Sequence, residues 1–308
     1  MNEKVSYTAL LTGGTGFLGS HILTRLLSER IAVVLLKRTH SSLNNIENFI
    51  NNPFLKIYDV DLIDVKDVFN ENKIDVIIHT ATDYGRNGFL TEVLNSNLIF
   101  PLSIIQEAIK HKVPYFINTD TFFNKGDLKY SHLINYSISK KLFLESIKEI
   151  SSDIKIINMR IEHMFGVNDS INKFVPKIIN KLVNNEPSIQ LTDGFQKRDF
   201  IYIKDVVDAF YSILKSLSDY SHPNFKTYDV GLGASMSIRE FATTLKEKTN
   251  SISFLDFGAI PTKKDEIMDS FANSEDLKSL GWTPTYSIQE AIGDLLIQIR
   301  NNTESKHG

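Results

Sequence analysis

Short apolar runs alternate with amphipathic stretches through the first half of the chain, and this alternation restricts its fold more than any other feature. The apolar runs predict six strands: Tyr7–Leu11, Ala32–Leu36, Leu55–Tyr58, Val76–His79, Tyr115–Asn118 and Lys155–Met159. Between them apolar residues recur at helical spacing, as at Leu18, Ile22 and Leu26. Strands that alternate with helices predict an α/β protein with a doubly wound parallel sheet. Such a sheet binds its ligand outside the carboxyl ends of the strands.

A glycine-rich loop lies between the first expected strand and the first expected helix. It reads Thr12-Gly13-Gly14-Thr15-Gly16-Phe17-Leu18-Gly19. Gly13 permits a tight turn, Gly16 lets a phosphate approach the backbone, and Gly19 lets helix and strand pack closely. Because a helix N-terminus attracts anions, we expect the glycines, with Phe17 and Leu18, to bind the pyrophosphate of a dinucleotide. Glycine clusters also mark ordinary turns, so the prediction depends on the flanking strand and helix.

The chain changes character after Gly166, where the regular alternation ends. The elements expected there are helices over Phe174–Asn184, Val206–Leu217 and Ile238–Thr249 and a strand over Tyr228–Gly231. We therefore expect a dinucleotide-binding Rossmann domain of residues 1–167, to which residues 202–232 return. Residues 168–201 and 233–308 are expected to form a smaller C-terminal α/β substrate-binding lobe.

Composition excludes several classes of function. The net charge of the 308 residues is −3, which gives no electrostatic basis for binding nucleic acid or an anionic membrane. The chain has no cysteine, so disulfides, thiolate metal sites and cysteine nucleophiles are excluded, and we expect no metal. No apolar run approaches the roughly 18 residues of a membrane span, and the N-terminus lacks the pattern of a signal peptide. We expect a soluble cytoplasmic protein.

Tyr136 and Lys140 lie four residues apart in a helical pattern that continues through Leu144 and Ile147. Residues at this spacing share a helix face, with roughly 5–6 Å between their Cβ atoms. A phenol has a pKa of about 10, and a neighbouring ammonium with an oxidised nicotinamide would lower it. Such a tyrosine exchanges a proton with an alcohol or carbonyl while a hydride moves. The same spacing is common on surface helices, which is the alternative interpretation.

Polar residues end the fifth expected strand, at Thr119, Asp120 and Thr121. Substrate lies at this end of a strand in a doubly wound sheet, so Thr119 is expected to orient the reacting oxygen. A strand-ending turn rich in Thr and Asp is the alternative. A third polar site is the run KRDFIYIKDV at residues 197–206, which alone would also fit an exposed strand with a charged end.

These sites occur in the order and at the distances typical of one family. The chain resembles the extended short-chain dehydrogenase/reductases that act on nucleotide-diphosphate sugars, the NAD-dependent epimerase/dehydratase family. The resemblance covers nearly the whole chain and includes His79-Thr80-Ala81, Asn97, Arg160–Gly166, Tyr228–Gly231 and Leu280-Gly281-Trp282. It implies that Thr119, Tyr136 and Lys140 are catalytic. It further implies cofactor contacts from Gly13, Gly16, Gly19, Asp61, Leu62, Thr80, Ala81, Asn97, Tyr136 and Lys140.

The same resemblance implies a substrate site. Its expected residues are Thr119, Asp120, Thr121, His163, Arg198 and Lys263, with Arg198 on the substrate diphosphate. Lys263 departs from the family, which usually has a second phosphate-binding Arg there. Phe123-Asn124 also departs from the usual Tyr-Gly, and Thr82 follows Ala81 in place of a second Ala. The rim of the substrate site is therefore expected to differ from that of the family.

Three reactions share this scaffold: 4,6-dehydration, epimerisation and 4-keto reduction. The dehydratases have Thr-Asp-Glu at this strand end, where the Glu removes the C5 proton. Thr121 stands in that place, and a hydroxyl cannot act as that base at neutral pH, so dehydration is disfavoured. Epimerases keep NAD bound and return the hydride, whereas reductases exchange spent cofactor.

The end of the second expected strand bears on the cofactor. An NAD site favours a carboxylate for the ribose 2′-hydroxyl, whereas a 2′-phosphate favours cations. Lys37 and Arg38 lie there, followed by Thr39, and no carboxylate is adjacent in the sequence. The two cations favour NADPH over NAD and hence net reduction. The alternative is that both side chains only solvate the strand end.

Four segments refine the resemblance. INTDTFFN, NMRIEHMFG, RDFIYIKDVVDAF and FGAI with DEIM resemble the CDP-abequose synthase type of reductase. That type implies NADPH-dependent reduction of the C4 ketone of a CDP-4-keto-3,6-dideoxy hexose for O-antigen and other surface polysaccharide. His163 stands where the family often has Asn, next to nicotinamide and sugar. It is expected either to bind substrate or to be a satisfied strand-end histidine.

Two other functions remain open. The first is an NAD-dependent nucleotide-sugar 4-epimerase. The second is a redox-sensing module that binds a dinucleotide without chemistry, although such modules commonly lose the Tyr or Lys that this chain keeps. The resemblance also implies a homodimer, in which helices around Leu98–Ile109 and Tyr136–Ile150 pair across a two-fold axis.

Overall fold

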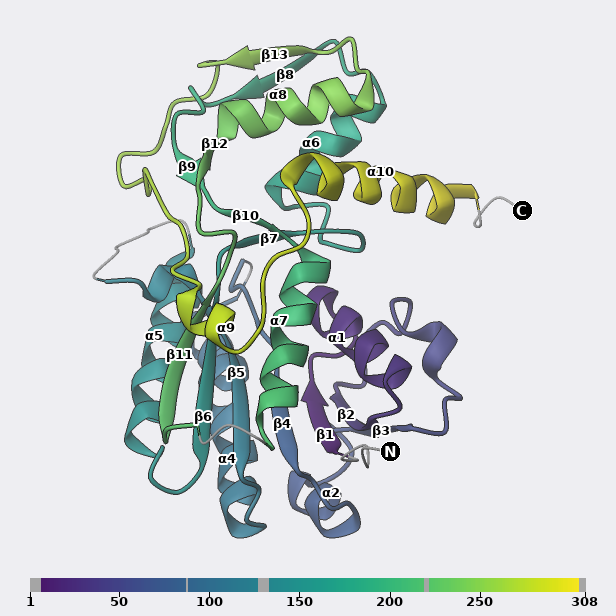
Figure 1. Cartoon of the computed structure of the whole chain (residues 1–308), viewed down its shortest axis with the longest axis vertical. Helices are drawn as coiled ribbons and strands as arrows, with labels where there is room; N and C mark the ends of the chain where they lie inside the picture. The colour runs from purple at the N-terminus through teal and green to yellow at the C-terminus, as the bar shows by residue number, and fades with distance from the viewer. Residues whose placement is uncertain (1–6, 87, 127–132, 219–221, 305–308) are drawn as a thin grey trace. The chain divides into compact units, whose positions relative to one another are not determined.

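The computed structural model describes residues 7–86, 88–126, 133–218 and 222–304 (Figure 1). The chain divides into two compact units. The first unit consists of residues 1–160 and 210–228, and the second of residues 161–209 and 229–308.

A seven-stranded sheet forms the centre of the first unit, in the order β11-β6-β5-β4-β1-β2-β3. The strands are β1 Thr8–Thr12, β2 Ala32–Lys37, β3 Leu55–Asp59, β4 Val76–His79, β5 Tyr115–Thr121, β6 Lys155–Ile161 and β11 Phe225–Val230. β1 pairs in parallel with both β2 and β4, and the order extends outwards from these pairs in opposite directions. This is the predicted doubly wound topology, with its switch point between β1 and β4.

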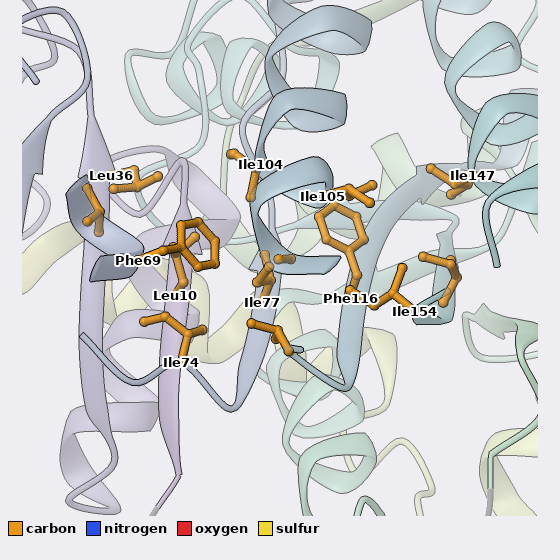
Figure 2. Packing of buried hydrophobic residues seen from close by; sticks show 14 of the residues in the cluster. Leu10, Leu36, Phe69, Ile74, Ile77, Ile104, Ile105, Phe116, Ile147 and Ile154 are labelled. Carbon is orange, nitrogen blue, oxygen red and sulfur yellow. The ribbon is translucent and has the colours of Figure 1, made fainter. Parts of the chain in front are cut away.

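Helices cover both faces of this sheet. They are α1 Phe17–Ser28, η1 Glu47–Phe49, α2 Val65–Glu71, α3 Leu90–Leu94, the π-helical turn η2 Asn95–Ile99, α4 Phe100–Lys110, η3 Phe122–Asn124, α5 Ile134–Glu149 and the later part of α7 Ile203–Ser216. Side chains alternate along each strand, so Leu10 and Ile77 face one side and their neighbours the other. On that side α2, α4 and α5 pack over the buried cluster around Phe116 (Figure 2). On the other side α1 meets α7, where the Arg25 guanidinium lies 4.3 Å from the ring centre of Tyr211.

All six predicted strands are present, and the errors lie at element ends. β5 runs to Thr121, three residues beyond its predicted end, because the polar residues Thr119, Asp120 and Thr121 keep the extended conformation of the strand. The helix predicted from Val206 begins earlier, at Ile203. The strand predicted from Tyr228 begins three residues earlier, as β11 at Phe225.

The second unit contains short strands paired two by two, the first part of α7 and further helices. They are β7 His163–Phe165, β8 Ser188–Leu191, β9 Lys197–Arg198, β10 Phe200–Tyr202, β12 Met236–Ser237, β13 Phe254–Phe257, α6 Phe174–Val183, α8 Ile238–Thr249, α9 Glu275–Ser279 and α10 Ile288–Glu304. β7 pairs with β10 and β8 with β13 in parallel, while β9 and β12 are antiparallel. The rings of Phe200 and Phe241 stack at 3.7 Å and join β10 to α8. Within the described part of the chain, no helix combines the length and apolar character needed to span a membrane.

Candidate active site

The glycine-rich loop is closely packed at the switch point of the sheet. Gly13 follows β1 with a left-handed backbone, at a φ of +70°. A Cβ atom there would lie 2.5 Å from the backbone nitrogen of Ala81, in the segment after β4. At Gly19 a Cβ atom would lie 2.2 Å from the carbonyl oxygen of Gly13. The predicted close approach of strand, loop and helix is therefore present, and any larger side chain at either position would force them apart.

The N-terminus of α1 is open to an anion. Gly16 precedes the helix, and its N–H donates to the Gly13 carbonyl over 2.9 Å. In the described residues no side chain caps this end, and the first turn carries no acidic residue. The N–H groups from Phe17 to Gly19 form the positive end of the helix dipole. The side chain of Leu18 is buried in the core, so its contribution to a ligand is limited to its backbone. This cradle fits the predicted pyrophosphate site.

The expected adenosine end contains a carboxylate that the sequence analysis missed, Asp59. Lys37 forms an ion pair with Asp59 at the end of β3, with 3.0 Å between Nζ and Oδ2. Thr39 donates its hydroxyl to Asp59 over 2.9 Å and its backbone N–H to Asp61 over 2.7 Å. The charge of Lys37 is therefore largely balanced, while the Arg38 side chain extends into solvent. Asp61 and the exposed Leu62 lie where the prediction placed an adenine contact, beside the ends of β2 and β3.

Thr80 and Ala81 join the end of β4 to β1. The hydroxyl of Thr80 donates to the Thr12 carbonyl over 2.7 Å, and the Ala81 N–H donates to the Thr12 hydroxyl over 3.3 Å. Both residues therefore lie beside Gly13, as their predicted role in cofactor binding requires.

Asn97 is buried, and its amide is used within the protein. Its Oδ1 accepts from the Asp83 N–H over 2.7 Å, and its Nδ2 donates to the Asp83 carbonyl over 2.7 Å. Nδ2 also donates to the Ser139 hydroxyl over 2.9 Å. Asn97 thus connects the loop after β4 to α5, and its contact with the cofactor stays a prediction.

Helix α5 carries Tyr136 and Lys140 on its buried face, and the end of β5 lies against them. Lys140 Nζ donates to the backbone carbonyl of Thr119 over 2.5 Å. The phenol of Tyr136 forms its side-chain hydrogen bond with Thr121. The hydroxyl of Thr119 is buried and lacks a partner among the described residues. The structure thus brings the three predicted catalytic residues together and leaves one buried hydroxyl available to a ligand, since such groups are seldom left unpaired.

The predicted lowering of the Tyr136 pKa depends on an oxidised nicotinamide as well as on Lys140, and the protein's own groups shift this pKa in the opposite direction. Burial raises the pKa of Tyr136 well above its ordinary value, and Tyr84 and Asp120 act in the same direction. The hydrogen bond from Thr121 lowers the pKa but does not outweigh burial. Lys140 directs its ammonium to the Thr119 carbonyl, so it does not offset the loss of solvation. Tyr136 is therefore a neutral phenol, the form that donates a proton.

Asp120 faces away from the two threonines that flank it, because side chains alternate along a strand. Its side chain is buried, and its oxygens accept hydrogen bonds from Asn124 over 2.7 Å and from Asn158 over 2.8 Å. Burial raises the pKa of this carboxyl. With 3% of its surface exposed, Asp120 is bonded within the protein, and its role in binding substrate stays a prediction. It belongs to an internal polar network that ties β5 to β6.

The second unit contains a pocket of about 650 Å³. His163 and Arg198 line it, as does Glu266 from the segment after β13. Three lysines follow at four-residue spacing, Lys173 at the N-cap of α6 and Lys177 and Lys181 within it; Lys173 pairs with Asp169 and Lys181 with Glu186. A pocket of this volume accommodates a ligand of nucleotide size, and its cations complement an anion.

Arg198 is held in the wall of this pocket. It is buried, donates to the Lys197 carbonyl over 2.8 Å and to the Ile267 carbonyl, and forms an ion pair with Glu266. Lys263, the predicted second phosphate contact, is exposed three residues before Glu266. Sequence reasoning missed Glu266, for which the only signal is its place after the two lysines of the same segment.

His163 lies at the pocket with a neutral imidazole. Burial lowers its pKa well below the ordinary value, and the charges of Arg198 and Lys173 lower it further. Its Nδ1 lies 4.0 Å from a carboxylate oxygen of Glu162, which in turn accepts from Ser270. His163 therefore lines the pocket and begins β7, and its role in binding substrate stays a prediction.

The family match, the similar sequences and the similar solved structures agree with one another. The chain matches the NAD dependent epimerase/dehydratase family over residues 9–231. CDP-abequose synthase of Salmonella muenchen is 36% identical over 300 residues, covering 96% of this chain and 98% of that protein. A dTDP-4-dehydro-6-deoxyglucose reductase of Escherichia coli is 24% identical, over 94% of this chain and 97% of that protein. The crystal structure of UDP-glucose 4-epimerase from Thermotoga maritima, solved with UDP-glucose, has a similar fold, with a TM-score of 0.81 at 19% identity over 96% of this chain and 99% of that one.

Proposed function

The chain belongs to the NAD-dependent epimerase/dehydratase family, and from this premise we propose that it is an NADPH-dependent nucleotide-sugar 4-ketoreductase. Its substrate is a nucleotide-diphosphate 4-keto-6-deoxy hexose, preferably the CDP-linked 3,6-dideoxy sugar. The observation that carries the proposal is a buried, protonated Tyr136 on the helix that packs on β5, whose Thr119 hydroxyl has no partner among the described residues. The identity to CDP-abequose synthase supports the choice of substrate.

Each catalytic residue has a distinct task in this proposal. Tyr136 donates its proton to the C4 oxygen of the sugar, and the Thr119 hydroxyl donates a hydrogen bond that orients the same oxygen. Lys140 holds the end of β5 through the Thr119 carbonyl and contacts the cofactor ribose. A bound reduced nicotinamide supplies the hydride. Because the reaction is a reduction, a phenol whose pKa is raised stays protonated at neutral pH and is ready to donate.

The remaining predicted residues divide between cofactor and substrate. The glycines and the first turn of α1 bind the pyrophosphate, and Asp61 and Leu62 contact the adenine. Arg38 binds the 2′-phosphate that distinguishes NADPH. In the second unit Arg198 and the lysines Lys173, Lys177 and Lys181 bind the nucleotide diphosphate. The Glu266 carboxylate must then release the Arg198 guanidinium or share it with the diphosphate.

An NAD-dependent 4-epimerase is the second candidate. The observation that favours it is the ion pair of Lys37 with Asp59, which removes one of the two cations on which the NADPH prediction depends. Carboxylates near the end of β2 are also what an NAD ribose prefers. Cofactor preference therefore separates the two functions.

We also propose a homodimer formed through α5. Ile134, Ile138 and Leu142 recur every four residues on this helix and are 50%, 36% and 45% exposed. Ile99 adds a side chain that is 56% exposed from η2, which packs beside α5. Such a stripe favours a second copy of the same face, because a two-fold axis places it against itself.

The function is tested by incubating the protein with NADPH and CDP-4-keto-3,6-dideoxyglucose and following loss of the nicotinamide absorbance. We expect stoichiometric oxidation of NADPH, with NADH a poorer donor. Tyr136→Phe should lower kcat at least about 100-fold, in the range of a lost general acid. Tyr211→Phe, a tyrosine on α7, serves as the control. Unchanged turnover in Tyr136→Phe, or tightly bound NAD with no net oxidation, would refute the reductase.

A further inference from the structure

Tyr84 covers one face of the proposed proton donor. It lies in the loop after β4, and its ring stacks on that of Tyr136 with 5.1 Å between centroids and 28° between planes. Phe123 meets Tyr136 edge-on at 6.1 Å and 78°. The Arg86 guanidinium lies 5.7 Å from the Tyr84 ring. Tyr136 is thus packed between two aromatic side chains from different segments.

The loop that carries Tyr84 is fixed at its backbone. Asn97 binds both the N–H and the carbonyl of Asp83, the preceding residue. Gly85, the following residue, has a φ of +61°, and a Cβ atom there would lie 2.9 Å from a methyl group of Val93. Both neighbours of Tyr84 are therefore held, which leaves its ring little freedom to move away.

The Asn97 side chain also connects this loop to the turn of α5 that contains Tyr136. The Asn97 amide donates to the Ser139 hydroxyl over 2.9 Å, and that hydroxyl donates to the Tyr136 carbonyl over 2.8 Å. Loop and helix turn are thus joined by hydrogen bonds as well as by stacked rings. This double connection distinguishes Tyr84 from an aromatic residue that only fills space.

We propose that Tyr84 is a positioning residue that fixes the ring orientation of Tyr136, so that the phenol hydroxyl is aimed at the substrate oxygen. This rests on the proposed function, in which Tyr136 donates a proton. A proton donor works only when it is correctly placed, and a misplacement of about 1 Å lowers a rate by roughly 100-fold. Removing the stacked ring is therefore expected to act mainly on kcat.

The test compares Tyr84→Ala, Tyr84→Phe and Tyr84→Trp. Tyr84→Ala should lower kcat roughly 10- to 100-fold while the KM for NADPH stays unchanged, and both aromatic variants should restore most of the rate. The matched control is Tyr211→Ala, which also removes a half-buried tyrosine packed on an arginine. It should keep its kcat. If Tyr84→Ala does not fold, Tyr84→Leu replaces it with the same expectation.

A pH profile adds a readout that a purely structural role would not move. The titratable groups facing Tyr136 are Tyr84 from the loop and Asp120 from β5, with Lys140 one turn along α5 and Arg86 behind Tyr84. The Tyr84 hydroxyl is one of the groups that raise the Tyr136 pKa. Tyr84→Phe should therefore lose activity at lower pH than the parent on the alkaline side.

Several outcomes overturn the inference. They are an unchanged kcat in Tyr84→Ala, an equal loss in Tyr211→Ala, or a loss in Tyr84→Phe as large as in Tyr84→Ala. Tyr136→Phe is measured in parallel. If Tyr136→Phe is inactive while Tyr84→Ala is fully active, this inference alone fails. If Tyr136→Phe is active, the proposed function fails first.

Discussion

Adding one methyl group at Gly19 should damage the dinucleotide site although Gly19 lies in a helix. The Cβ atom would stand 2.2 Å from the Gly13 carbonyl oxygen, where ordinary contact begins at 3.4 Å. The neighbour is backbone, so the loop and helix must separate by about 1 Å, and overpacking of this kind costs about 1–3 kcal/mol. Alanine gains about 1 kcal/mol over glycine in helix propensity, so strain is expected to prevail. The moved carbonyl also holds the N–H of Gly16 over 2.9 Å, which distorts the proposed phosphate cradle.

Gly19→Ala should raise the Kd for NADPH at least about tenfold, equivalent to about 1.4 kcal/mol, measured by fluorescence titration. Gly293→Ala is the matched control, because its Cβ position in α10 has open space within 4 Å among the described residues. That variant should gain about 1 kcal/mol of unfolding free energy and bind NADPH unchanged. If Gly19→Ala binds NADPH as tightly as the parent and unfolds no earlier, the packing argument for the loop is wrong.

Three further changes test other parts of the molecule. Arg38→Ala should raise the KM for NADPH roughly tenfold and leave the KM for NADH nearly unchanged, because it removes the exposed cation beside the paired Lys37. Equal effects on the two KM values in steady-state assays would refute an NADPH site at the end of β2. Burial, followed by the charge of Lys140, lowers the pKa of His79 to about 3 from an ordinary 6.5. The unfolded chain then binds a proton that the folded protein does not, so this stability is complete above pH 6.5 and falls by up to about 1.4 kcal/mol per pH unit below it. The free energy of unfolding, measured with urea at pH 7 and pH 5, should fall between these two values in the parent and fall less in His79→Phe. An equal fall in both proteins would contradict this prediction. Ile138→Glu should convert a dimer into a monomer in light scattering, whereas Ile50→Glu, at an apolar position off α5 that is 39% exposed against 36% for Ile138, should not.

Much of the fold could be predicted from the pattern of apolar residues within single strands and helices. Alternating strands and helices predict the doubly wound sheet because each strand is buried on both faces and each helix on one, and this information is contained within single elements. The glycine loop is equally local, since Gly13 and Gly19 are required by contacts within one βα unit and the adjacent β4. Errors in the predicted strand ends arise where polar residues continue a ladder, as in β5, because hydrophobicity no longer marks the strand.

The site was less predictable where it depends on contacts between elements. Lys37 lies opposite Asp59 in the parallel register of β2 and β3, a pairing visible only once the two strands are aligned. Asp120 is adjacent to Thr119 and Thr121 in sequence, but strand geometry turns it to the opposite face, into a network with Asn158. The Tyr136 pKa was predicted from Lys140 and an oxidised nicotinamide, and the prediction omitted the burial that raises this pKa within the protein.

The central claim is that a protonated phenol at residue 136 gives its proton to a sugar ketone. It is tested most directly by the pH dependence of the single-turnover rate of NADPH oxidation with the CDP-4-keto-sugar. The account predicts a constant rate through neutral pH, a decline only above the ordinary pKa of a phenol, and loss of the reaction in Tyr136→Phe. A rate that rises with pH through neutrality, or a Tyr136→Phe variant with the parent's profile, would contradict it.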